Sequence, residues 1–144
     1  MKELTLREIN RFDYQKTRKF VDKELAYISH LGTKLTCLLP PNAGRQLSFT
    51  DKVSLSFSNS SKQEKYVEKK DYIEYQIKTE IDKIKDSLLK MSKDELFIFE
   101  KIYIYQNTET DIMDETSWSQ TKLIRIKKSF IIKFALSKGI DFEK

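Results

Sequence analysis

The chain contains few glycines, prolines and cysteines, the residues that turn the backbone or cross-link a protein. Its 144 residues include 3 Gly, 2 Pro and 1 Cys. Because Cys37 has no second cysteine to pair with, an internal disulfide and a cysteine-based zinc site are both excluded. No apolar run reaches the ~18 residues of a membrane span, and the residues after Met1 lack the apolar stretch of a signal peptide. We therefore expect a cytoplasmic protein without a membrane partner.

Residues that could carry catalysis or hold a metal are equally sparse. His30 is the one histidine, and Cys37 follows two helical turns later, too far away for a direct hydrogen bond. We expect an exposed or partly packed His30 and a buried Cys37. Asp111, Asp114 and Glu115 have no identifiable third ligand segment for a metal, and no Gly-rich phosphate loop occurs. The chain is therefore expected not to be an enzyme and to need no cofactor or metal.

The composition favours helices. Charged residues make up 34% of the chain, which together with the scarcity of Gly and Pro is typical of long solvated helices. We predict an all-α fold in three parts. These are an N-terminal helix and linker over 1–58, a central amphipathic helix over 59–92, and a C-terminal helix-turn-helix over 93–144.

The N-terminal part is predicted to be one long helix over 6–39. Thr5 and Glu8 form a capping pattern at its start, and Pro40-Pro41 stops it. Gly32 lies in its apolar stripe, where it either permits close approach of another helix or ends this one. In the linker 40–60, alternation at 53–57 is compatible with a short strand, although a lone strand has no partner. The stripe consists of Tyr14, Val21, Leu25, Ile28, Leu35 and Leu39.

The central helix carries a regular apolar seam. It opens with a capping pattern at Ser61–Glu64. Two interpretations stay open at equal weight: a homodimer seam, or an amphipathic face packed on the first helix. The seam consists of Ile77, Ile81, Ile84, Leu88 and Met91, in steps of 4, 3, 4 and 3.

The C-terminal part contains the most regular helix signals. A capping pattern at Ser92–Glu95 starts a supporting helix that bears Leu96, Phe99, Ile102 and Tyr103 and ends at Asn107. Thr108 and Asp111 cap a short second helix. Trp118-Ser119 closes a turn, and Ser119 caps a third helix that ends at Gly139. We expect Trp118 to be wedged between the last two helices and the Leu96/Phe99 face. The last helix has an apolar stripe of Leu123, Ile126, Phe130 and Phe134.

Charge is divided sharply within this part. Residues 93–118 include 2 basic and 7 acidic residues, a net of −5, whereas residues 119–144 include 7 basic and 2 acidic residues, a net of +5. A basic helix attracts the polyanion DNA and releases its counterions. The alternative is a solvated helix face. Two helices joined by a short turn, with the second one basic, favour a DNA-recognition helix in the major groove.

Several segments resemble a known family. Asp111–Ser119 is similar to the acid-Ile-Ala-x-x-Leu-Gly-apolar-Ser pattern of helix-turn-helix proteins, with Met113, Thr116 and Ser117 at the usual Ala, Leu and Gly positions. Met is adaptable and Trp118 is large, so both can fill the gap that these departures leave. Further segments with family-like sequence are Phe12–Thr17, Val21-Asp22, Thr121, Arg125–Lys128 and Phe134–Leu136.

These segments resemble the ArpU/RinA group of phage-encoded transcriptional regulators, whose helix-turn-helix is similar to region 4 of sigma factors. The resemblance implies a regulator of late phage genes, or of a lysis or packaging operon, in the cytoplasm of a bacterial host.

The residues that would contact double-stranded DNA follow from helix geometry. Gln120, Thr121 and Arg125 point away from the apolar stripe and are expected to read base edges. Ser119, Lys122, Lys127 and Lys128 are expected to hold phosphates. In the alternative from another class, the helices 6–39 and 61–91 form a protein-interaction module that binds host RNA polymerase or another phage protein, and the basic helix only supports docking.

Overall fold

The computed structural model describes residues 3–38 and 61–144, with the side chains of residues 61–67 left out. Every regular element in these ranges is a helix, so the predicted all-α class is confirmed. One isolated bridge, between Phe12 and Glu143, is the β pairing found there. Leu39, the linker 40–60 and its possible strand lie outside the described residues.

The single helix predicted over 6–39 is wrong: three helices take its place. They are α1 (Leu6–Ile9), α2 (Tyr14–Glu24) and α3 (Ala26–Leu38). The Thr5 capping box starts α1 as predicted. The Asp13 side chain then accepts a hydrogen bond from the Lys16 amide and starts a second helix, and the backbone bends again at Leu25. The predicted stripe is buried at Val21, Leu25, Ile28 and Leu35, with Tyr14 packed partly buried at its edge.

Gly32 permits close approach and does not end its helix. It lies within α3, where α3 crosses the π-helix η1 (Glu100–Ile104). A Cβ atom built at Gly32 would meet the backbone carbonyl oxygens of Ile104 and Tyr103, the latter at 2.8 Å. The absence of a side chain therefore brings these two backbones together.

The proposed dimer seam is used within the chain, which corrects that interpretation. The long helix α6 (Ser61–Lys83) ends before Ile84, the short α7 (Lys85–Leu88) follows, and Met91 lies beyond both. Ile77 and Met91 belong to the buried core, and the other three seam residues, Ile81, Ile84 and Leu88, are partly buried against it. The 4-3-4-3 spacing therefore marks an internal packing face, because the helix breaks before the seam is complete.

The C-terminal part begins its helices where the capping signals predict, but the supporting helix expected to end at Asn107 changes from α-helix to π-helix at Glu100 and ends at Ile104. Ser92 and Thr108 each form a complete capping box at the start of α8 (Lys93–Phe99) and α9 (Glu109–Thr116). Ser119 caps α10 (Gln120–Ser137). Beyond α10 the chain reverses at Gly139, whose φ of 76° suits glycine.

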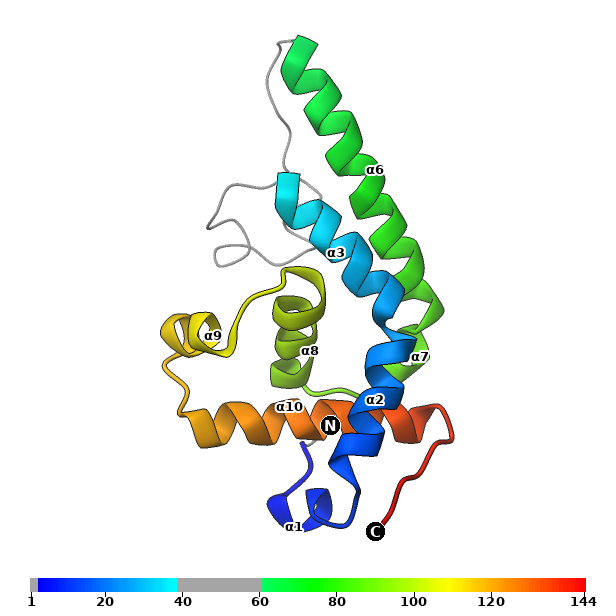
Figure 1. Ribbon diagram of the computed structural model, residues 1–144, viewed down its shortest axis with the longest axis vertical. Helices are drawn as coiled ribbons and strands as arrows, with labels where there is room; N and C mark the ends of the chain where they lie inside the picture. The colour runs from blue at the N-terminus through cyan, green and yellow to red at the C-terminus, as the bar shows by residue number, and fades with distance from the viewer. Residues whose placement is uncertain (1–2, 39–60) are drawn as a thin grey trace.

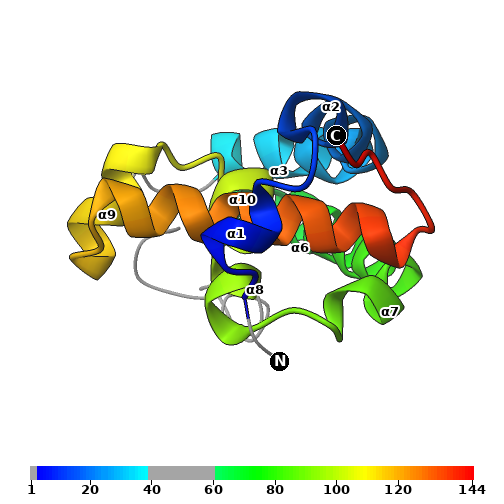
Figure 2. The same ribbon diagram turned by 90° about the horizontal axis from the view of Figure 1, so that it is seen from below.

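Helix α10 lies at the centre of the molecule (Figures 1 and 2). It packs against α1, α2, α7, α8 and α9. A large core joins Val21, Ile77 and Phe130, so the three parts expected from the sequence share one core. A smaller cluster of Ile98, Ile112, Leu123 and Ile126 joins α8, α9 and the N-terminal half of α10. Of α10, the N-terminal half is thus the part left with an open face.

Candidate nucleic-acid interface

A three-residue turn, Ser117 to Ser119, joins α9 to α10. Ser117 adopts the left-handed conformation, with φ 62° and ψ 18°, and its amide donates to the Met113 carbonyl. The Thr116 hydroxyl donates to the Ile112 carbonyl at 2.7 Å and accepts from the Trp118 amide at 3.2 Å. Thr116, which replaces the usual Leu, therefore holds the turn with hydrogen bonds in place of apolar packing.

Trp118 packs on a different face from the predicted one. Its indole is partly buried and meets Phe97 edge to face, with ring centroids 5.6 Å apart. Phe99, the expected neighbour, lies in the large core and contacts Tyr103 and Phe130. Residues 97 and 99 are about 200° apart around a helix, so they face different clusters. The expected contact of Trp118 with Phe99 is therefore wrong, and Phe97 takes that place.

Helix α9 is held at both of its ends by ion pairs. Near its C-terminus, Glu115 lies 3.3 Å from the Lys101 ammonium, which is 3% exposed. The same ammonium lies 5.4 Å from the centre of the Phe97 ring and 5.8 Å from that of Tyr105. At the N-terminal end, Glu109 lies 3.4 Å from Lys127 of α10. With Asp111 in the capping box, three of the four acids of α9 have structural partners.

The predicted base-contacting residues lie on the open half of α10. Gln120 and Thr121 are exposed, and Arg125 is half-buried. At 100° per residue, Thr121, Arg125 and Lys128 fall within an arc of about 60° on the side away from Leu123 and Ile126. Ser119 and Lys122 are exposed beside this arc. Arg125 carries no ion pair among the described residues, so its guanidinium is available to a ligand.

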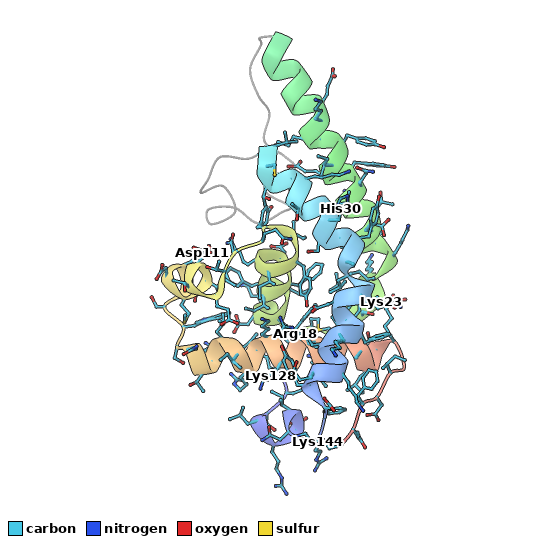
Figure 3. All side chains as sticks on the ribbon, viewed as in Figure 1. Arg18, Lys23, His30, Asp111, Lys128 and Lys144 are labelled. Carbon is cyan, nitrogen blue, oxygen red and sulfur yellow. The ribbon has the colours of Figure 1, made fainter. Side chains whose placement is uncertain are left out.

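Lys127 and Lys128 lie in different surroundings, although both were expected to contact phosphates. Lys127 does not share the open face, because its side chain is 18% exposed and is paired with Glu109. Neighbouring residues on a helix are 100° apart, so Lys127 turns toward α9 when Lys128 turns outward. Lys128 lies over the Tyr14 ring, 5.0 Å from its centre. Figure 3 shows Lys128 beside α10 and Asp111 on α9.

Side chains in the C-terminal half of α10 bind a buried carboxylate, and this role of the carboxylate was not predicted from the sequence. Glu95, fully buried, accepts hydrogen bonds from Ser129 at 2.9 Å and from Lys133 at 2.7 Å. Ser129 in turn accepts from the Leu4 amide at 2.7 Å, which fixes the N-terminal segment against α10. Glu95 was expected only to cap α8. The Ser and Lys four residues apart on α10 were the available signal.

His30 and Cys37 lie on a separate surface. Both line an open groove of about 510 Å³ between α3 and α6, together with Tyr72 and Lys69. Cys37 is exposed, so the expectation that it is buried is wrong. It lies in the last turn of α3, and Leu35 is the last residue of this helix in the large core.

Comparisons with family models, curated proteins and solved structures gave no match. Among the described residues, no helix combines the length and the apolar character needed to cross a membrane. Function therefore has to be inferred from the geometry of the site itself.

Proposed function

We propose that this chain is a sequence-specific DNA-binding regulator of transcription that inserts the N-terminal half of α10 into the major groove. The observation that carries the proposal is the selective exposure of that half-helix. The open stretch runs from Gln120 to Lys128, because the residues from Ser129 to Ala135 are buried, apart from the partly exposed Lys133, where α10 packs against other helices. An α-helix with its side chains is about 10–12 Å in diameter and fits the ~12 Å width of the major groove.

The chemistry of the open face suits base recognition. Arg125 projects a guanidinium that can make two parallel hydrogen bonds to the O6 and N7 atoms of guanine. The Gln120 amide suits adenine in the same way, and Thr121 can contact either base type. Ser119, Lys122 and Lys128 flank these groups and are placed to hold phosphates, which fix the register without reading sequence.

The likeness to the ArpU/RinA group extends the proposal to biological context. It favours a phage-encoded regulator of late, lysis or packaging genes that acts on double-stranded DNA in a bacterial host. In this role the chain performs no catalysis. The left-handed turn at Ser117, the position of the usual glycine, is compatible with a helix-turn-helix of this kind.

The test begins with capture of bound fragments from the phage or host genome. Enrichment of one promoter region is the expected result. Fluorescence anisotropy on that fragment and on a scrambled duplex then measures specificity. Lys78→Ala provides a matched control, since it removes an exposed positive charge from α6, away from α10. Equal affinity for both duplexes would contradict sequence-specific recognition.

A second candidate, a protein-interaction module for RNA polymerase, has its own supporting observation. Tyr27 of α3 and Tyr72 and Tyr75 of α6 are 50%, 63% and 68% exposed. Aromatic residues are enriched at protein interfaces. Purified polymerase core should bind the parent chain and lose affinity for the Tyr72→Ala/Tyr75→Ala variant. Absence of any binding by the parent would rule this candidate out.

A further inference from the structure

Helix α9 has little apolar packing of its own. Ile112 is its one buried residue, and Met113 is partly buried against the same small cluster. A helix of eight residues with so small a buried face has few contacts that define its orientation. The two ion pairs at its ends supply contacts of that kind.

The two pairs connect α9 to different elements. Glu115 binds Lys101 of η1, and Glu109 binds Lys127 of α10. They lie six residues apart on α9, so one restrains each end of the helix. The Lys101 pair is the more buried of the two and is packed between aromatic rings. Together they oppose rotation of α9 relative to α10 about the Ile112 contact.

Buried or half-buried ion pairs contribute little net stability, because desolvation of the charges offsets their attraction. In some proteins such pairs select one arrangement among several of similar energy. A partly exposed pair such as Glu109–Lys127 is also screened by water and salt. These two pairs are therefore better suited to orienting α9 than to stabilising the fold.

We propose that Lys127 and Lys101 are positioning residues that set the angle between α9 and α10 and thereby the sequence specificity of α10. The inference rests on the proposed DNA-binding function and deepens it. Lys127 belongs to the basic helix by sequence, yet it acts on DNA only through Glu109 and α9. A small rotation of α9 shifts how far Arg125 enters the groove, while phosphate contacts by mobile lysines adapt to it.

A salt titration distinguishes the two possible roles of Lys127, positioning α9 or contacting a phosphate. Lys127→Ala and Glu109→Gln are each expected to lower the ratio of cognate to scrambled affinity by about 2- to 30-fold, the range by which residues that connect two sites modulate the coupling between them. The salt slope on scrambled DNA stays unchanged in both variants. The exchanged pair Lys127→Glu/Glu109→Lys restores the ratio. Lys101→Met, which keeps the buried volume of Lys101, lowers the ratio as well.

The results of these titrations distinguish a failure of the proposed DNA binding from a failure of the proposed positioning role. If the parent chain binds no DNA, the proposed function fails. If the parent is specific but Lys127→Ala lowers the salt slope by about one and weakens cognate and scrambled binding equally, Lys127 contacts phosphate and the inference is overturned. Unchanged specificity in both Glu109→Gln and Lys101→Met would overturn it as well. A loss of helicity, measured by circular dichroism, would assign the pairs to stability instead of positioning.

Discussion

Gly32→Ala should destabilise the protein even though alanine is the better helix former. In an unobstructed helix the change gains about 1 kcal/mol. Here the added Cβ would meet the carbonyl oxygens of Tyr103 and Ile104, the first at 2.8 Å. Both are backbone atoms of η1, so no side-chain rotation can relieve the contact. The two segments have to separate, which exposes apolar surface around Leu31 and Leu35.

Insertion of a methyl group into a tight core typically costs 1–3 kcal/mol, and the backbone contact places this site at or above the upper end. After the gain in helix propensity is subtracted, a net loss of about 2 kcal/mol or more remains, or a fall of at least roughly 6 °C in Tm for a chain of this size. Urea denaturation followed by circular dichroism measures it, with exposed Lys34→Ala in the same helix as the control. A Gly32→Ala variant as stable as the parent would refute the close approach of α3 and η1.

Substitutions at three further positions test the turn and the core. Trp118→Ala should lower the free energy of unfolding by about 2–3 kcal/mol, less than the 3–5 kcal/mol of a fully buried aromatic residue, because the indole is only partly buried. A tryptophan emission maximum typical of full exposure to water, measured in the folded parent, would contradict the contact with Phe97. Ser117→Gly should be neutral or stabilising by up to about 1 kcal/mol, since it removes left-handed strain, whereas Ser117→Val should lose at least that much in thermal melts. Burial, followed by the Asp22 carboxylate, raises the pKa of Tyr103 above 10.0. The folded state then retains the phenol proton to a higher pH than the unfolded state, so the stability that this proton contributes is present below pH ~10 and falls above it. Tyr103→Phe should therefore reduce the loss of stability at alkaline pH, measured by unfolding titrations. An unchanged dependence of stability on pH above pH ~10 would argue against this role of Tyr103.

Local hydrogen bonding made the helix starts predictable. The capping boxes at Thr5, Ser92 and Thr108 each involve residues three positions apart, so the sequence contains the whole interaction. The apolar stripe of α10 was predictable for a related reason, because helical periodicity determines which residues share a face. The Asp13 side chain has the same capping chemistry, but the prediction extends one helix from the Thr5 capping pattern to Pro40-Pro41 and so passes through this second start.

The errors arise where two segments meet. The seam at 77–91 has the spacing of a dimer interface and of an internal face alike, and the positions of α3, which packs on α6, and α10, which packs on α7, decide between them. Lys127 and Lys128 are indistinguishable by charge, and the carboxylate of Glu109 on another helix separates their roles. Glu95 serves both as a cap and as a buried partner of Lys133, and the second role depends on how α8 crosses α10. Such pairings are not encoded within a single helix.

The most direct test of the account compares Arg125→Ala with Lys128→Ala on cognate and scrambled duplexes at several salt concentrations. Arg125→Ala should cost about 1–3 kcal/mol on the cognate site and relax the preference at one base position. Lys128→Ala should weaken both duplexes alike and lower the salt slope by about one. The difference is expected because a guanidinium can pair with guanine through two hydrogen bonds, whereas an ammonium acts as a point charge. If neither substitution changes binding to any DNA, the open half of α10 is not a nucleic-acid interface, and the proposed function is contradicted.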